Sequence, residues 1–156
     1  MIKKALCIGN VQYPEAPLKN PVNDATDLSR RLEALGFSCQ LCKDASNRSM
    51  DEALKDFASE LSGAEVGLFF FAGHGMQISG ENYLTAIDTD FDSETYHRSR
   101  CRRSTLGMAK HLKPLPFLAV INKCPSICPP FRVRHARGHF YSVFQRSVLS
   151  SHDTCG

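Results

Sequence analysis

A histidine between two glycines, His74 with Gly73 and Gly75, is the residue of this chain best suited to acid–base chemistry. It closely follows residues 66–71, six positions that are apolar or glycine without a polar break. Such a run is expected of a parallel strand buried on both faces. Ligands bind at the carboxyl ends of strands in open α/β sheets. The pattern therefore indicates either an active-site histidine or a histidine that only ends a strand.

A second group of reactive side chains lies near the carboxyl end of the sequence. Its spacing is Cys-x3-Cys-x6-His-x3-His, formed by Cys124, Cys128, His135 and His139. Thiolates and imidazoles are zinc ligands, but two-Cys two-His fingers separate their pairs by about twelve residues. The gap here is half as long, so we predict no metal and no cofactor and keep zinc binding by the tail as an alternative.

Length and composition describe one globular domain of 156 residues, 42% of them hydrophobic. The amino terminus lacks a secretory pattern, and no apolar run approaches the length of a membrane span. Seven cysteines are an odd number, which favours thiols over a disulfide framework. We therefore expect a cytoplasmic protein with no membrane partner.

Charge divides the chain at Tyr96. Residues 1–95 carry 8 Lys and Arg against 15 Asp and Glu, whereas residues 96–156 carry 11 against 1. We expect two regions, a folded domain over 1–95 and a basic tail over 96–156. The abrupt change also suggests that the chain leaves its original reading frame near Tyr96, which the coding DNA can test.

Residues 1–75 alternate between strand and helix patterns. Strands are predicted over 5–8, 37–41 and 66–71. Asn20 is expected to cap a helix that ends at Gly36, and the apolar face of this helix is expected to consist of Ala25, Leu28, Leu32 and Leu35. A capping box at 49–52 is expected to start a second helix, which ends near Gly63 and buries Met50, Leu54, Phe57 and Leu61. This β-α-β-α-β order predicts a parallel sheet covered by helices.

Nucleotide binding is disfavoured, because neither a Gly-x-Gly-x-x-Gly fingerprint nor a phosphate-binding Gly-Lys-Ser/Thr loop is present. A series of other motifs instead resembles the caspase-like cysteine peptidases, which include caspases, metacaspases and paracaspases. The motifs are ALCIGN at 5–10, LKNPVNDA at 18–25, FFFAGHG at 69–75 and NYL at 82–84 with Asp88. The resemblance covers roughly residues 1–95. It implies the large-subunit half of an α/β fold, a three-layer caspase-like sandwich with a mainly parallel sheet.

The resemblance implies roles for several residues. His74 would hold a cysteine ionised and later protonate the leaving amine, and the N–H of Gly75 would help to form an oxyanion hole. Asp24 would accept a substrate Arg or Lys, although stabilisation of its own helix by the macrodipole explains it equally well. Asp88 and Asp90 either line the same cleft or are loop carboxylates, the reading that their position favours.

The nucleophile implied by the resemblance is Cys124, which ends the apolar run 116–124 fifty residues after His74. A weak helix pattern at 105–113 precedes this predicted strand. Three neighbours depart from the family pattern: Asn122 replaces an acidic residue, Lys123 replaces a small one, and Pro125 removes an N–H donor. An ordinary thiol at position 124 is therefore the alternative.

Beyond Cys124 the family fold continues with helices and two more strands, and residues 129–156 are too short to supply all of these. We therefore expect a sheet that is incomplete at the carboxyl end, with an exposed edge that favours a homodimer or a partner fragment. The arginines of the tail could contact nucleic acid, but a solvated or disordered segment fits better. These arginines are Arg98, Arg100, Arg102, Arg103, Arg132, Arg134 and Arg137.

The resemblance thus implies a cysteine endopeptidase that acts on peptides or proteins, with a preference for a basic residue before the cleaved bond. Two alternatives stay open. One is a non-catalytic caspase-like module that binds proteins, and the other is a zinc- or nucleic-acid-binding role of the basic tail.

Overall fold

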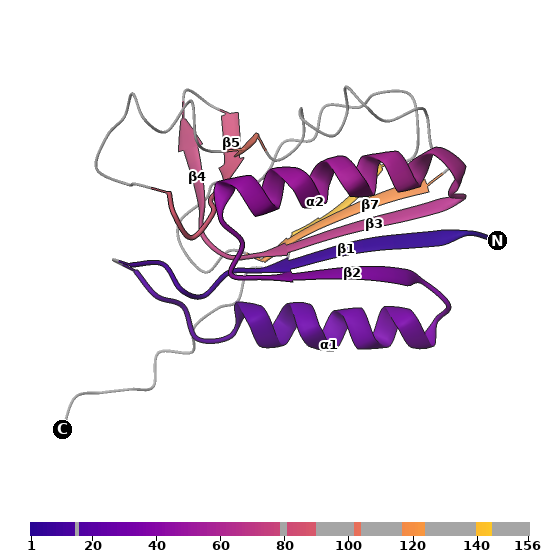
Figure 1. Cartoon of the computed structure of the whole chain (residues 1–156), viewed down its shortest axis with the longest axis horizontal. Coiled ribbons are helices and arrows are strands. Elements are labelled where there is room, and N and C mark those ends of the chain that lie inside the picture. Colours follow the sequence, from indigo (N-terminus) through magenta and orange to yellow (C-terminus); the bar gives the residue numbers. More distant parts are fainter. Residues whose placement is uncertain (15, 79–80, 90–101, 104–116, 124–139, 145–156) are drawn as a thin grey trace.

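The computed structural model describes residues 1–14, 16–78, 81–89, 102–103, 117–123 and 140–144 (Figure 1). The helices are α1 (Pro21–Ala34), α2 (Asn47–Glu60) and the short 3-10 helix η1 (Leu61–Gly63). The strands are β1 (Lys3–Gly9), β2 (Ser38–Lys43), β3 (Val66–Ala72), β4 (Gly75–Ile78), β5 (Glu81–Leu84), β6 (Arg102–Arg103), β7 (Phe117–Lys123) and β8 (Phe140–Phe144).

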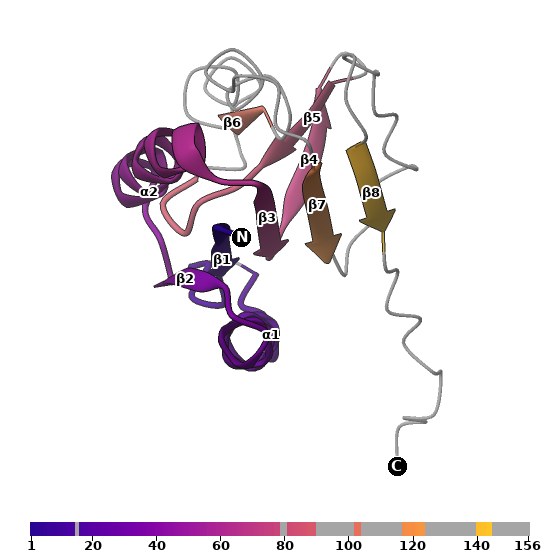
Figure 2. The same ribbon diagram turned by 90° about the vertical axis from the view of Figure 1, so that its right-hand side faces the viewer.

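The main sheet has five strands in the order β2-β1-β3-β7-β8, and all neighbours in it are parallel. Helix α1 lies on one face of the sheet and α2 on the other, so the described chain forms three layers (Figure 2). The predicted α/β sandwich with a parallel sheet is therefore confirmed. β3, the strand that leads to His74, is the middle strand of the five.

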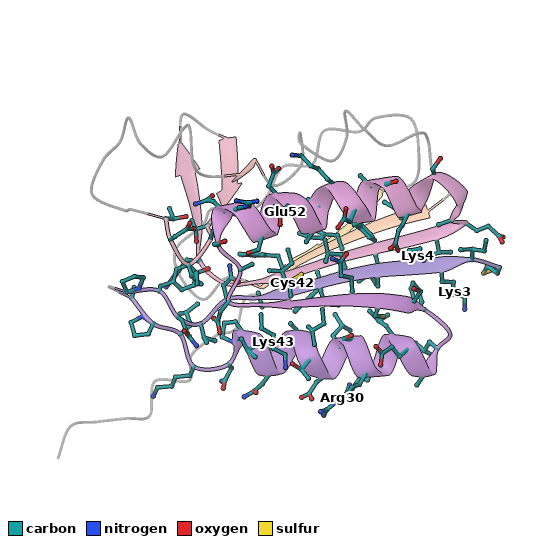
Figure 3. All side chains as sticks on the ribbon, in the orientation of Figure 1. Lys3, Lys4, Arg30, Cys42, Lys43 and Glu52 are labelled. Carbon is teal, nitrogen blue, oxygen red and sulfur yellow. The ribbon has the colours of Figure 1, made fainter. Side chains whose placement is uncertain are left out.

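The side chains of β3 alternate between two cores, because successive residues of a strand point to opposite faces. Phe69 and Phe71 join the cluster beneath α2, whereas Phe70 and Ala72 join the cluster beneath α1. Cys42 of β2 lies on the α2 side of the sheet, while Arg30 projects outward from α1 (Figure 3). Helices on both faces thus explain why the strand is apolar without alternation.

Helix α1 differs from its prediction at both ends. Asn20 is the N-cap residue, but its side chain makes no capping hydrogen bond. Leu35, expected on the buried face, is 64% exposed because it lies just beyond the helix, where Gly36 reverses the chain at φ 85°. Ser29 is instead buried between Ala25 and Leu32.

Helix α2 begins earlier than the predicted capping box. Its N-cap is Ser46, whose hydroxyl accepts a hydrogen bond from the Ser49 amide at 3.2 Å. The capping box at 49–52 is therefore wrong, since these residues already lie inside the helix. The predicted buried stripe is confirmed for Met50, Phe57 and Leu61, and Leu54 packs against the same core.

The later strands extend the fold beyond the predicted elements. β7 confirms the strand expected at 116–124, and it pairs with β3 over its whole length. β8 adds a further parallel strand within the tail, which differs at these residues from the solvated segment that the composition favoured. β4 and β5 form an antiparallel pair with β6 that was not predicted. The weak helix pattern at 105–113 lies outside the described residues, and none of the described helices is long and apolar enough to cross a membrane.

Candidate active site

His74 lies just beyond the carboxyl end of the central strand β3. It is two residues after Ala72, the last residue that pairs with β1, and Gly73 lies between them. The intervening Gly73 is required by close packing. A Cβ at this position would lie 2.6 Å from the phenolic oxygen of Tyr13 and 2.8 Å from the ring of Phe71. The glycine therefore allows the chain to pass directly over Tyr13 before the half-buried His74.

The imidazole of His74 contacts Ala16 and Tyr13. Its Nε2 lies 2.7 Å from the carbonyl oxygen of Ala16, and its ring meets the edge of the Tyr13 ring at a centroid distance of 4.6 Å and an angle of 65°. A carbonyl oxygen only accepts hydrogen bonds, so Nε2 carries the proton in this contact. In the neutral ring Nδ1 is then the basic nitrogen, as a general base requires.

The backbone of His74 is held from both sides. Its N–H donates to the hydroxyl of Tyr13 at 3.0 Å, and its carbonyl oxygen accepts from Thr85 N at 3.2 Å and Thr85 Oγ1 at 2.8 Å. Sequence reasoning missed both Tyr13 and Thr85. The available signals were an aromatic residue in a proline-containing loop after β1 and a hydroxyl residue directly after the NYL motif.

Gly75 follows His74 directly and starts β4, where its register partner is Leu84 of β5. The predicted oxyanion-hole residue is therefore the first residue of the antiparallel β4–β5 pair, directly after the histidine.

Asp24 occupies the first turn of α1 and is half-buried. The start of this helix packs against the end of β1, since a Cβ on Gly9 would lie 2.5 Å from the carbonyl oxygen of Pro21. The parallel strands β1 and β3 have their carboxyl ends at the same end of the sheet. Asp24 therefore lies at the same end of the sheet as His74. Both readings of Asp24, substrate binding and helix stabilisation, are compatible with this position.

Asp88 has a structural partner. Its Oδ1 accepts hydrogen bonds from the backbone N of Asn47 at 2.7 Å and from Asn47 Nδ2 at 2.9 Å. The exposed carboxylate thus caps the start of α2, which supports the loop-carboxylate reading. Asp90 lies outside the described residues.

The described cysteines are poorly suited to nucleophilic attack. Burial raises the pKa of the Cys7 thiol to about 12, and burial is also the main cause that raises the pKa values of Cys39 and Cys42. A reactive cysteine needs a lowered pKa, because the thiolate is the nucleophile. Cys124 itself lies outside the described residues, one position after the end of β7.

The tail residues considered for zinc, Cys124, Cys128, His135 and His139, also lie outside the described residues. Within the part of the chain that the structure describes, no group of three or more Cys, His, Asp or Glu side chains could hold a metal ion. Of the tail arginines, only Arg102 and Arg103 are described, and they form β6.

Comparison with known proteins gives a family and a set of relatives. A model of the caspase domain matches residues 2–133, which extends the match beyond residue 95 and across position 124. Over 87 residues the chain is 34% identical to the human mucosa-associated lymphoid tissue lymphoma translocation protein 1, and equally to its mouse homolog. This alignment covers 55% of the chain, 11% of the human protein and 10% of the mouse protein. The chain thus spans about a tenth of these relatives.

Two solved structures share the fold. A protein of Geobacter sulfurreducens superposes with a TM-score of 0.55 at 15% identity, over 80% of this chain and 50% of that one. The Drosophila initiator caspase Dronc superposes with a TM-score of 0.51 at 13% identity, over 78% of this chain and 47% of that one.

Proposed function

This chain belongs to the caspase-domain family, and we propose that it is a cysteine-type endopeptidase in which His74 is the general base and Cys124 the nucleophile. The preference is for a basic residue before the cleaved bond, with Asp24 as its acceptor.

The register between β3 and β7 is the observation that carries the proposal. Ala72, the last residue of β3, pairs with Lys123, the last residue of β7. Neighbouring strands are about 4.8 Å apart, and consecutive Cα atoms are about 3.8 Å apart. Cys124 is bonded to Lys123 and His74 is two residues from Ala72, so this register supports a site that the two residues share.

The proposed chemistry uses these residues as follows. Nδ1 of His74 takes the proton of the Cys124 thiol, and the thiolate sulfur bonds to the carbonyl carbon of the substrate. The N–H groups of Gly75 and Cys124 donate to the negative carbonyl oxygen. Breakage of the C–N bond then transfers the proton from His74 to the leaving amine, and water hydrolyses the thioester to release the acid and restore the thiol.

The substrate preference is supported by the charge and location of Asp24. A carboxylate attracts the guanidinium or ammonium group of a substrate Arg or Lys. Its place at the start of α1, at the sheet edge that His74 occupies, suits a pocket for the residue that precedes the cleaved bond.

A non-catalytic protein-binding module is the second candidate, and the sequence around Cys124 favours it. Pro125 lacks an N–H, and Lys123 stands where the family has a small residue. The proposed second copy or partner fragment and the cytoplasmic location stay predictions for either function.

Cleavage of a fluorogenic peptide with Arg before the fluorophore tests the proposal. We expect hydrolysis by the parent and a loss of at least about a hundredfold in kcat/KM for His74→Ala and for Cys124→Ala. Cys42→Ala is the matched control, because it removes a thiol whose pKa is raised by burial. Cleavage that survives Cys124→Ala overturns the assignment of the nucleophile, and no cleavage by the parent favours the binding module.

The basic preference has its own pair of variants on one helix. Asp24→Ala should raise KM for the Arg peptide, whereas Asp27→Ala should not. Asp27 belongs to the same helix, but its side chain is 67% exposed and lies 3.9 Å from Arg30. Equal values for the two variants contradict the role of Asp24.

A further inference from the structure

We propose that Tyr13 is a positioning residue for His74. The Tyr13 hydroxyl fixes the position of the His74 backbone, and the loop that carries Tyr13 fixes the distance between the imidazole and the Ala16 carbonyl oxygen. The inference rests on the proposed function only in so far as His74 is the residue that transfers the proton.

The hydroxyl of Tyr13 is buried at the centre of the site. Tyr13 is 1% exposed, although it belongs to a loop between β1 and α1. Its oxygen accepts from the His74 amide at 3.0 Å and donates to the carbonyl oxygen of Thr85 at 3.1 Å. A phenol in this position connects the segment that carries His74 with the segment that follows β5.

Thr85 completes the clamp from the opposite side. It is fully buried, and it gives the His74 carbonyl oxygen a backbone and a side-chain hydrogen bond. The N–H and the C=O of His74 are therefore both bonded to side chains that do not belong to the β3 ladder. Displacement of the Tyr13 oxygen has to move the His74 backbone, the Thr85 carbonyl, or both.

The loop that carries Tyr13 also carries the partner of the imidazole. Tyr13 N and Leu18 N both donate to the carbonyl oxygen of Val11 at 3.0 Å, which closes the loop that contains Ala16. Asp44 fixes the beginning of this loop, since its Oδ1 accepts from the amides of Val11 at 2.8 Å and Gln12 at 3.0 Å.

One loop thus meets His74 at three points: the amide through the Tyr13 hydroxyl, the ring through the Tyr13 ring, and Nε2 through Ala16. Tyr13→Phe keeps the ring and removes only the hydroxyl. The amide of His74 and the carbonyl of Thr85 then lose a buried partner, so the loop shifts relative to the histidine and the 2.7 Å contact with Ala16 loosens.

The test compares full-chain variants in two assays. In peptide hydrolysis we expect Tyr13→Phe to lower kcat about 10- to 100-fold with KM within about twofold, because misplacement of a proton-transfer group affects the transition state more than binding. In nitrogen NMR of the histidine rings we expect the parent to show His74 as the Nε2–H tautomer. Tyr13→Phe should show a mixture of tautomers.

Threonine variants provide the matched control. Thr85→Val should reproduce the loss of kcat, and Thr85→Ser, which keeps a hydroxyl, should restore most of it. Thr89→Val removes a buried hydroxyl that accepts from the Ala86 amide at 3.0 Å in the same segment, without a hydrogen bond to His74 from that hydroxyl, and should leave kcat unchanged.

The outcomes separate this inference from the proposed function. A parent chain that cleaves no peptide contradicts the proposed peptidase function. The NMR comparison still tests the role of Tyr13 in that case. Parent-like tautomer populations in Tyr13→Phe overturn the inference, whether or not the parent cleaves peptides. A loss of kcat in Thr89→Val equal to that in Thr85→Val also overturns it, because a general loss of stability then explains both.

Discussion

The side-chain amide of Asn10 donates to the carbonyl oxygen of Thr85 at 3.2 Å, although 75 residues separate them in the sequence. The other end of the same amide, Oδ1, accepts from the Ala45 amide at 2.9 Å. Asn10 is fully buried. A single side chain therefore joins three segments that follow β1, β2 and β5, and Thr85 in the last of these also bonds the His74 carbonyl oxygen.

Loss of this amide should destabilise the whole fold. Asn10→Ala leaves the buried Ala45 amide without this partner, whereas the Thr85 carbonyl keeps the Tyr13 hydroxyl, so we expect the unfolding free energy to fall by roughly 1–3 kcal/mol. Urea unfolding followed by circular dichroism measures it. Asn23→Ala on the exposed side of α1 is the control and should change the free energy by less than about 0.5 kcal/mol. Similar effects of the two substitutions would contradict the bridging role.

Two glycines should respond differently to alanine. A Cβ on Gly73 meets Tyr13 at 2.6 Å and Phe71 at 2.8 Å, whereas a Cβ on Gly63 meets no atom within 4 Å. We expect Gly73→Ala to cost about 1–3 kcal/mol through overpacking and Gly63→Ala to be within about 0.5 kcal/mol of the parent. Thermal unfolding of both variants checks this, and a neutral Gly73→Ala would be the contrary result.

The N-cap residues of α1 and α2 should contribute differently to stability. Ser46 bonds the Ser49 amide, so Ser46→Ala should lower the unfolding free energy by about 1 kcal/mol. Asn20 makes no side-chain capping bond, and Asn20→Ala should cost less than about 0.5 kcal/mol. Denaturant midpoints measure both variants, and a larger loss for Asn20→Ala than for Ser46→Ala would contradict these capping roles.

Cys7 should make stability depend on pH in the alkaline range. Burial raises the pKa of its thiol from 9.0 to about 12, so the folded state keeps a proton that the unfolded state loses. The stabilisation is complete below pH 9.0 and disappears as the pH approaches 12. In urea unfolding, the parent should therefore lose up to about 1.4 kcal/mol per pH unit more than Cys7→Ala in this window. Equal slopes would exclude Cys7 as the cause.

Periodicity in the sequence was sufficient to predict the layered architecture. The unbroken apolar run of β3 and the stripe of Met50, Phe57 and Leu61 both describe surfaces that a large core must bury, and such surfaces repeat at the spacing of the element. β7 matches the apolar run 116–124, where the family resemblance implied the strand before the nucleophile. The errors occur where one hydrogen bond decides the outcome: Ser46 rather than Ser49 starts α2, because capping depends on which hydroxyl reaches the next turn.

Only some residues of the candidate site could be predicted from the sequence. His74 and Gly75 could be proposed from the sequence because a strand, two glycines and a family motif surround them. Tyr13 and Thr85 were missed because each is distant in sequence from the other and its contact with His74 is a tertiary one. The β4–β5 pair was missed since its short strands lack a clear alternation, and β8 was missed because a five-residue strand in a basic tail has no strong pattern.

The central place of β3 has a consequence for how His74 can be displaced. Its backbone is paired with β1 on one side and β7 on the other, so its amides can exchange with solvent only when one of these ladders opens. Fraying at an edge strand such as β2 leaves the histidine in place. Hydrogen exchange should accordingly be slowest in β3, and His74 should be displaced by global unfolding and not by local opening of the sheet.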